Sequence, residues 1–382
     1  MRIAHVTATF PPYRGGTGNV CFYNARELAR RGHQVTVFTA AAEGAPDQER
    51  IEGFQVQRLR PWLRVGNAPL LPQLTTALHG YDIIHLHLPF IAGGELSSLG
   101  AALRQTPLVV TYHSDLINDG SWRDLVFRAA MWSSRHAVMM RADAVLFVSQ
   151  GHAETCAQHV VYDRMRQRCH ILPNGVDTEL FRPGTDGAAT RQRLGLEAER
   201  PVVGFVGVLD RAHHYKGLAV LMAALSEPAC SEVQLLIVGD GELKEEYSQR
   251  ATQHSLNERT VFFGRASHGE LAALLRACDL LSVPSLAPES FGMVIVEAFS
   301  CGVPVVASDG PGVRSLVESG IDGFLTPSGD AAALAERVQV LLTLPTAQRQ
   351  AMGQAGRRKV EQHYAWPQIG ARLEEIYRQC LA

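Results

Sequence analysis

The chain has 382 residues, more than one hydrophobic core usually organises, which predicts two domains. Its 46% hydrophobic and 19% charged residues are ordinary for a soluble globular protein and supply enough apolar side chains for two cores. The formal net charge of −2 excludes a global positive field for collecting nucleic acid, so no nucleic-acid partner is expected.

Short β-branched runs alternate with helical patterns along the first half of the chain, which is typical of parallel α/β sheets. Between the first two runs, an amphipathic stretch over Val20–Arg31 predicts a helix with Gly32 as its C-cap. The predicted strands of this half are Ile3–Thr7, Gln34–Phe38, Ile83–Leu86, Leu108–Thr111, Ala144–Val148 and Cys169–Leu172.

A turn-rich segment from Pro173 to Gly187 cannot continue a helix or a strand, and it predicts the boundary between the domains. A second series of strands follows it, so the fold class is α/β, with two Rossmann-like domains. Because ligands of open parallel sheets bind outside the carboxyl ends of the strands, two such domains facing each other would enclose a central cleft. The strands of this series are Val202–Val206, Gln234–Val238, Thr260–Phe263, Leu280–Val283, Val303–Ala307 and Gly323–Thr326.

The most informative stretch runs from Pro284 to Gly302. It predicts a strand end, a loop that holds Glu289, and a helix from about Phe291 to Ser300 with Glu297 inside it. The free amides at the start of this helix form a natural seat for a phosphate, and the two carboxylates suit hydrogen bonds from diols. In the plainer alternative, Glu289 is a solvated loop charge and Glu297 a surface helix residue.

The chain resembles a known family at this point. Glu289 and Glu297, with Phe291-Gly292 and Cys301–Ser308, are similar to the Glu-seven-residues-Glu motif of glycosyltransferase family four, the group 1 enzymes with the GT-B fold. The resemblance covers essentially the whole chain. Segments that match in the same order are Pro11–Gly16, Gly32–Val37, Thr111–His113, Val148-Ser149, Pro173–Asp177, Lys216-Gly217 and Gly310–Gly312.

The resemblance gives the two domains their expected roles. Residues 1–178 form an N-terminal acceptor domain, completed by a C-terminal helix over 366–382. Residues 179–200 form a linker, and residues 201–365 form the nucleotide-sugar donor domain.

In the family, the first Glu of the motif contacts hydroxyls of the donor sugar and the second holds the ribose, which assigns these roles to Glu289 and Glu297. The amides of Gly292 and Met293 fall where the family binds the diphosphate. The predicted donor-binding segment around them comprises Ser290, Phe291, Gly292, Met293 and Val294.

A basic pair usually neutralises the leaving phosphates in this family, and Lys216 matches the Lys of its Lys-Gly pair. A fixed cation stabilises the charge that builds on the departing diphosphate. Val208 stands where many relatives carry the partner Arg, so Arg211 is the predicted substitute. Asp210 could instead hold Arg211 in a structural ion pair.

Three further positions match the family. His113, after a strand end, matches the His that approaches the donor sugar's 6-position. Gly15 and Gly16 match a loop where the backbone approaches the diphosphate and sugar closely, and the following Thr17-Gly18 predicts a flexible loop. Base recognition is expected from the backbone near Gly264 and Arg265.

The resemblance implies a retaining, metal-independent transfer of a hexose-type sugar from a UDP- or GDP-linked donor. The acceptor is expected to be a glycan, a lipid-linked or a small molecule, in cell-surface glycan or glycoconjugate biosynthesis. Two alternatives stay open. One is a sugar-phosphate synthase, or a nucleotide-sugar epimerase or hydrolase, of the same fold, and the other is a catalytically inactive binding module.

No cofactor or metal is expected. The sequence has no D-x-D, no P-loop signature, and no G-x-G-x-x-G after a strand. His85 and His87 lie on one face of a strand end, which suits a metal pair, but no third ligand is evident nearby.

The cysteine spacing indicates the compartment. The seven cysteines form no C-x-x-C pair, which favours free thiols in a reducing compartment, and we expect a cytoplasmic protein. Residues 122–141 mix aromatic and Met side chains with arginines, so they predict either a peripheral contact with the inner face of the cell membrane or an ordinary core helix. We favour the core helix.

Overall fold

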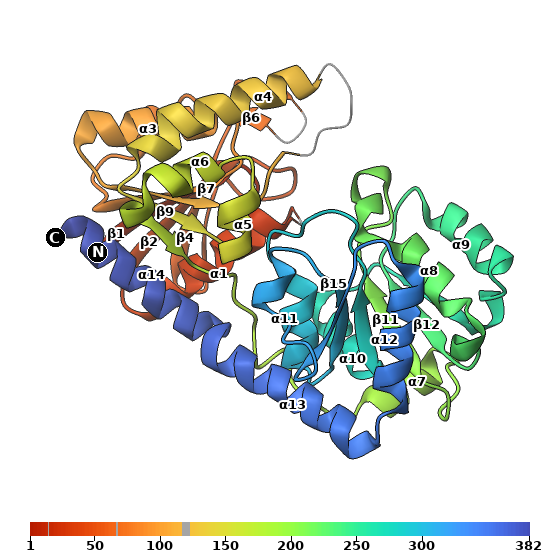
Figure 1. Ribbon diagram of the computed structural model, residues 1–382. Helices are drawn as coiled ribbons and strands as arrows, with labels where there is room; N and C mark the ends of the chain where they lie inside the picture. Colours follow the sequence, from red (N-terminus) through yellow and green to blue (C-terminus); the bar gives the residue numbers. More distant parts are fainter. Residues whose placement is uncertain (14, 66–67, 117–122) are drawn as a thin grey trace. The chain divides into compact units, whose positions relative to one another are not determined.

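The computed structural model describes residues 1–13, 15–65, 68–116 and 123–382. The chain divides into two units, Met1–Gly175 with Trp366–Ala382, and Val176–Ala365. Each unit is built on its own largely parallel sheet with helices packed against it, as the ribbon in Figure 1 shows. This arrangement confirms the predicted α/β fold class of two Rossmann-like domains.

The first unit contains an eight-stranded sheet in the order β10-β9-β8-β7-β1-β2-β4-β3, parallel except for β3, which runs antiparallel to β4. All six strands predicted for this half are present. The central strand β7 is buried along its whole length, which places its two histidines inside the unit. The strand bounds are β1 Arg2–Val6, β2 Gln34–Ala40, β3 Gln48–Ile51, β4 Phe54–Leu59, β7 Ile83–Leu88, β8 Leu108–Tyr112, β9 Ala144–Phe147 and β10 Cys169–Ile171.

Four strands were missed from sequence. β4 alternates buried and solvent-facing residues at its start, a period-two pattern that could have identified it. β3 is polar and lies at the sheet edge, where its backbone pairs with β4 and Glu49 forms an ion pair with Arg58. The other two, β5 (Leu63–Val65) and β6 (Ala68–Leu70), form a separate two-stranded hairpin.

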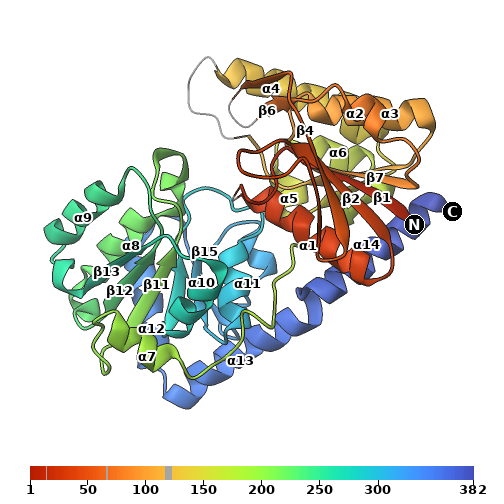
Figure 2. The same cartoon turned by 180° about the vertical axis from the view of Figure 1, so that it is seen from behind.

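The C-terminal helix α14 (Trp366–Leu381) packs into the first unit beside α1 (Gly16–Arg30), and Figure 2 shows the two helices from behind. The Trp366 ring stacks on Tyr23 with centroids 4.8 Å apart, and Trp366 is almost fully buried. The remaining α-helices of this unit are α2 Leu74–Ala77, α3 Gly93–Arg104, α4 Arg123–Ser133, α5 Gln150–Thr155 and α6 His159–Arg164.

The second unit contains a six-stranded parallel sheet in the order β13-β12-β11-β14-β15-β16, and all six strands were predicted. Helices α8 and α12 pack together on this unit. The strands are β11 Val202–Val206, β12 Gln234–Val238, β13 Thr260–Gly264, β14 Leu280–Val283, β15 Val305–Ser308 and β16 Gly323–Thr326. The helices are α7 Gly187–Arg193, α8 Leu218–Leu225, α9 Lys244–Gln253, α10 His268–Arg276, α11 Met293–Ser300, α12 Ala331–Thr343 and α13 Thr346–His363.

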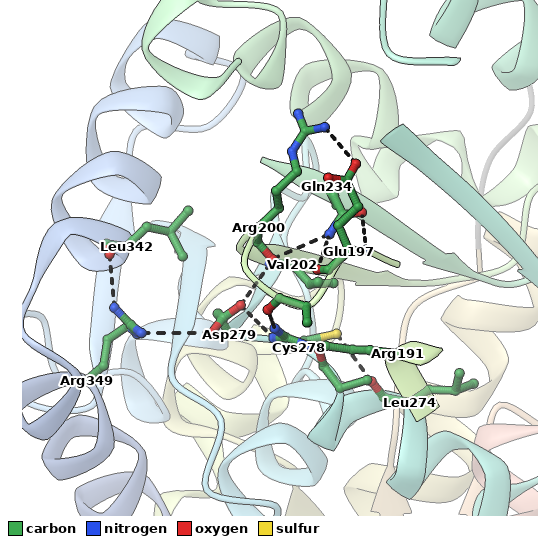
Figure 3. A network of polar contacts seen from close by, with 12 residues as sticks. Arg191, Glu197, Arg200, Val202, Gln234, Leu274, Cys278, Asp279, Leu342 and Arg349 are labelled. Carbon is green, nitrogen blue, oxygen red and sulfur yellow. Dashed lines mark hydrogen bonds and ion pairs between the residues drawn. The ribbon is translucent and has the colours of Figure 1, made fainter. Parts of the chain in front are cut away.

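Residues 179–200, predicted as a linker, belong to the second unit and contain helix α7. Figure 3 shows how polar contacts attach them to the sheet. Arg191 pairs with Asp279 at 2.7 Å, and the same carboxylate accepts a hydrogen bond from the Val202 amide at 2.8 Å. Arg349 approaches the other oxygen of Asp279 at 3.9 Å. Because one carboxylate contacts several elements, residues 179–200 are ordered against the second unit rather than forming a free linker.

The stretch predicted over 122–141 forms α4, then a π-helical turn (Ser134–Val138) and a 3-10 turn (Met139–Arg141), while Trp122 lies outside the described residues. Val138 and Met139 are fully buried, as a core helix requires. Leu125 and Trp132 are 73% and 64% exposed, so the expectation that the whole apolar stripe packs inward was wrong for α4. Among the described residues, no helix combines the length and apolar character that a membrane span needs.

Candidate active site

An ion pair between Lys216 and Glu289 lies at the end of the second unit's sheet. Lys216 ends a 3-10 turn (Arg211–Lys216) after β11, and Glu289 lies in the loop after β14. The Lys216 Nζ donates to Glu289 Oε1 at 2.6 Å, and the Ser285 hydroxyl donates to the same oxygen at 2.8 Å. Burial, the largest single effect, lowers the pKa of Lys216, but the charges of Glu289 and Tyr215 and the hydrogen bond to Glu289 together outweigh it, and the pKa lies above its ordinary value.

The backbone around this pair is closely packed. Gly217 follows the lysine with φ +77°, and a Cβ there would lie 1.9 Å from the carbonyl oxygen of Pro284. The Leu286 amide also donates to the Tyr215 carbonyl at 2.6 Å. The two loops are therefore held together by main-chain contacts, which fixes the lysine opposite the glutamate.

Helix α11 begins at Met293, two residues later than predicted, because Gly292 is its N-cap with φ +99°. No side chain caps this helix start, so its first amides are available to an anion. Phe291 is buried and its ring lies 5.8 Å from that of Tyr364, which leaves only its main chain for a ligand. A Cβ on Gly312 would lie 2.0 Å from the Glu289 carbonyl oxygen, so the loop containing Gly312 supports this segment from behind.

Glu297 lies inside α11 and is only 8% exposed. Its carboxyl group makes no hydrogen bond or ion pair with any residue that the structure describes, and burial raises its pKa to about 7. A buried carboxyl without a protein partner is costly, and this one is suited to hydroxyl donors of a bound ligand. The alternative that Glu297 is a surface helix residue is wrong.

Arg211, the predicted basic partner of Lys216, and Arg265, predicted near the base, are both exposed and lie near carboxylates other than Glu289. The Arg211 side chain is 86% exposed and lies 3.7 Å from Glu242, while Asp210 pairs with His213. Arg265 is also exposed, and its Nε lies 3.7 Å from Asp240. The structure therefore brings Lys216 to Glu289, and it places Arg211 on a different carboxylate.

At the ends of β12 and β13, close contacts are made between main-chain atoms of glycines. Gly264 has φ +89°, and its carbonyl oxygen accepts from the Gly239 amide at 2.8 Å. Gly239 in turn packs on Gly207, because a Cβ there would lie 1.8 Å from the Gly207 carbonyl oxygen. Tight backbone contacts of this kind suit recognition of a flat base by main-chain groups.

In the first unit, Gly15 is the N-cap of α1 and Gly16 its first residue, again without a side-chain cap. Gly18 lies in the first helical turn, where a Cβ would lie 2.6 Å from the Thr9 carbonyl oxygen. The segment predicted as a flexible glycine loop is therefore a helix start packed on the chain before it.

His113 follows β8, and its amide donates to the Leu88 carbonyl at 3.0 Å. Its Nε2 contacts Nδ1 of His87 at 2.9 Å. Burial, with a contribution from His152, lowers the pKa of His113 to about 3, so the ring is neutral at physiological pH. His113 is 8% exposed, and within the described residues its Nδ1 has no partner.

Behind His113, the structure adds a histidine that sequence reasoning missed. His5 on β1 pairs in register with His85 on β7, and ring nitrogens of His5, His85 and His87 lie within 4.8 Å of one another. The parallel pairing of two central strands was the available signal. The nitrogens of all three rings already contact neighbouring polar groups.

Two Rossmann-like units, with Lys216, Glu289 and His113 placed after strand ends where ligands of parallel sheets bind, are the architecture expected of GT-B glycosyltransferases. The comparisons with known proteins agree. The description "Glycosyl transferases group 1" matches residues 186–359, and "Glycosyltransferase Family 4" matches residues 14–180. The chain belongs to this family, the group 1 enzymes of glycosyltransferase family four, and it is a glycosyltransferase.

Individual relatives carry several activities. A D-inositol 3-phosphate glycosyltransferase from Catenulispora acidiphila is 31% identical, over 97% of this chain and 93% of its own. A GDP-mannose-dependent alpha-mannosyltransferase from Mycolicibacterium smegmatis is also 31% identical, over 100% and 98%. The Anabaena protein HepE, solved with UDP-glucose, superposes with a TM-score of 0.77 at 25% identity, covering 99% of this chain and all of that one.

Proposed function

We propose that the protein is a retaining, metal-independent transferase that moves a hexose-type sugar from a UDP- or GDP-linked donor to an acceptor. The acceptor is a glycan, a lipid-linked or a small molecule, and the setting is cell-surface glycan or glycoconjugate biosynthesis in the cytoplasm. The Lys216–Glu289 pair carries the proposal, because it combines a held cation with a carboxylate at one loop junction. Relatives that use GDP-mannose or bind UDP-glucose support a nucleotide-sugar donor.

The lysine serves the leaving group. As the glycosidic bond to phosphate breaks, negative charge grows on the diphosphate, and a cation already fixed in place lowers the barrier without reorganisation. Glu289 keeps Lys216 in position and charged before the donor binds. The carboxylate itself has a second oxygen for hydrogen bonds from sugar hydroxyls.

Helix α11 serves the rest of the donor. Its uncapped amides at Met293 and Val294 suit the diphosphate, since the N-terminus of a helix favours anions. Glu297, one turn further, accepts hydrogen bonds from the ribose hydroxyls when it is ionised. Both roles use groups that have no protein partner among the described residues.

Transfer with retention fits the state of the carboxylates. Glu289 is held by Lys216 and Ser285, which suits hydrogen bonding to the sugar rather than attack on its anomeric carbon. A path in which the leaving phosphate assists deprotonation of the acceptor on the same face needs no protein nucleophile. We therefore assign no residue as a covalent nucleophile.

Product analysis tests the proposal. Incubation with UDP-glucose or GDP-mannose and candidate acceptors, followed by NMR of the product, should give a glycoside with the donor's anomeric configuration in the presence of a chelator. Free sugar, an isomerised nucleotide sugar or a sugar phosphate would favour the alternative enzymes. Inversion, or a requirement for a divalent cation, would overturn the proposal. Nucleotide binding without turnover would indicate a binding module.

We also propose that α3 and α4 contact the inner face of the cell membrane. Leu99 and Leu103 on α3 are 48% and 69% exposed, and Leu125 and Trp132 are exposed on α4. The Ser98 hydroxyl donates to the Ala137 carbonyl at 2.7 Å, which ties α3 to the turn that continues α4. An exposed apolar face beside arginines favours an anionic lipid surface.

Sedimentation with vesicles tests this contact. Vesicles rich in anionic phospholipid should carry down the wild type, and Trp132→Ser with Leu125→Ser should weaken binding about tenfold or more. Ile321→Ser, which removes a 49% exposed side chain from the second unit, is the matched control and should bind as the wild type does. Equal binding by both variants would contradict a membrane role for α4.

A further inference from the structure

A continuous chain of hydrogen-bonding groups runs through the interior of the first unit to His113. His85 Nε2 contacts the Thr111 hydroxyl at 2.7 Å, and its Nδ1 contacts the Tyr377 hydroxyl at 2.5 Å. The Tyr377 oxygen lies 3.4 Å from His5 Nε2, the longest link. His5 Nδ1 meets His87 Nε2 at 2.9 Å, and His87 Nδ1 meets His113 Nε2 at 2.9 Å.

All four rings are neutral. Burial lowers the pKa of His5 to about 3, and it lowers the pKa of His85 and of His87 well below the ordinary value. A neutral imidazole has one N–H donor and one bare acceptor nitrogen. Each histidine that has two neighbours in the chain therefore accepts a hydrogen bond from one of them and donates a hydrogen bond to the other.

The two hydroxyls decide that direction. Thr111 is 3% exposed, and in the part of the chain that the structure describes its hydroxyl has only His85 as a partner. If the chain ran from His113 toward Thr111, the Thr111 proton would be left buried without an acceptor. If His85 and His5 both donated to Tyr377, the tyrosine proton would be stranded in the same way. An unsatisfied buried donor is costly.

Only one arrangement uses every buried proton. Thr111 donates to His85, His85 to Tyr377, and Tyr377 to His5, after which His5 donates to His87 and His87 to His113. In this arrangement all four histidines carry their proton on Nδ1. His113 then presents Nδ1–H, the nitrogen that has no partner among the described residues.

We propose that His5, His87 and Tyr377 are positioning residues that hold His113 in its Nδ1–H tautomer, so that it offers a neutral hydrogen-bond donor to an oxygen atom of the bound ligand. That the ligand is the donor sugar rests on the proposed function. A neutral N–H donor binds a hydroxyl or ring oxygen, whereas a charged imidazolium would also attract phosphate. In this tautomer Nδ1 carries a proton, so it cannot act as a base.

Imidazole nitrogen NMR tests the tautomers directly. In full-length protein with ¹⁵N-labelled histidine, without ligand, long-range proton–nitrogen spectra distinguish Nδ1–H from Nε2–H rings. Signals are assigned with single histidine variants. We expect Nδ1–H at His5, His85, His87 and His113, in at least about tenfold excess over the other tautomer.

Two nearly isosteric variants separate positioning from simple packing. Tyr377→Phe removes the link between His85 and His5, so both tautomers of His5 leave one nitrogen unpaired, and the excess at His113 should fall to about twofold or less. Thr111→Val removes the first donor and should have the same effect, while Thr111→Ser should restore the wild-type spectrum. Thr39→Val is the matched control, because Thr39 is equally buried in the same sheet but its hydroxyl has no partner among the described residues.

Other outcomes overturn the proposal. Nε2–H at His113 in the wild type would reverse the direction of the chain, and an unchanged spectrum in both Tyr377→Phe and Thr111→Val would make the contacts merely structural. A stoichiometric metal ion bound to the histidines would replace the protons altogether. Because the spectra need no substrate, a failure here is distinct from a failure to find glycosyl transfer.

Discussion

The Lys216–Glu289 pair of the second unit lies in loops after strands, whereas the histidine chain of the first unit lies mostly within the strands of its sheet and reaches a strand end only at His113. The pair is charged and retains some exposure, with the two side chains 23% and 9% accessible. The histidines are neutral, and burial keeps them so. A charged pair can meet the growing charge of a leaving diphosphate, whereas a neutral chain can only fix the direction of a hydrogen bond. We therefore expect changes at the pair to cost more activity.

The largest effect is expected for Lys216→Met. Loss of the fixed cation should reduce kcat by about 10²–10³-fold. It also leaves Glu289 without its charged partner, so thermal unfolding must be measured alongside turnover. Lys216→Arg is the control that keeps the charge and should retain more activity. Equal turnover by the Met variant and the wild type would break the distinction between the two regions.

A smaller effect is expected at the end of the histidine chain. His113→Asn keeps an N–H donor near the position of Nδ1, whereas His113→Asp keeps the shape but offers only acceptors at neutral pH. We expect kcat/KM to fall about tenfold for Asn and a further tenfold or more for Asp, consistent with a lost hydrogen bond and an added charge. Equal activities for the two variants would remove the need for a donor at this position.

The buried carboxyl of Glu297 should add a pH dependence to stability. Its pKa is raised from 4.5 to about 7 in the folded protein, so between these values the folded state holds a proton that the unfolded state has released. The contribution of this group to the free energy of unfolding should therefore decrease as pH rises through this window, by on the order of 3 kcal/mol. The buried histidines, whose pKa values are lowered, act in the opposite sense over the same range, so the decrease is measured as the difference in denaturant unfolding between the wild type and Glu297→Gln at pH 5 and pH 8.

Glu297→Gln is the control for this dependence. Since the histidines titrate equally in both proteins, the difference between wild type and variant isolates the carboxyl. A difference that is constant with pH would mean that Glu297 is not protonated near neutrality. In the wild type, nucleotide binding should also strengthen as pH rises toward 8, because the ionised carboxylate accepts from ribose hydroxyls.

The last prediction concerns the loops that hold the lysine, where the effect is on the fold and only indirectly on turnover. Gly217→Ala forces a Cβ against the Pro284 carbonyl at a φ of +77°, and it should destabilise the fold by about 3 kcal/mol or more. Gly195→Ala is a matched control, because Gly195 has φ +71° but nothing lies within 4 Å of its Cβ position. That variant should cost only about 1–2 kcal/mol. Similar losses of stability in both variants would show that the positive φ alone, without the close packing on Pro284, accounts for the cost of Gly217→Ala.

Much of the fold could be predicted because each parallel strand is a short apolar run bounded by turn residues. β11 and β12 were predicted with the bounds that the structure gives them. The residues 179–200 were expected to form a linker because the turn-rich segment from Pro173 to Gly187 runs into them, but Asp279, far along the chain, orders them. A contact of that separation leaves no local signal.

Some residues of the candidate site could be predicted from the sequence, and others could not. Glu289 and Glu297 stood out because they flank a predicted helix start after a strand and match the motif of the family, and Lys216 stood out because it matches the family's Lys-Gly pair. His5 did not, because its significance depends on pairing between β1 and β7. The Arg211 side chain lies near Glu242, a contact that spacing along the sequence could not reveal.

Calorimetric titration of UDP and GDP tests the central claim, a metal-free diphosphate site at Lys216 and the start of α11. Each nucleotide should be added to the wild type with and without a chelator, and to Lys216→Met. The account predicts that one nucleotide binds equally well in both conditions and at least about tenfold more weakly to the variant. Binding that requires a divalent cation, or that is the same in Lys216→Met, would contradict it.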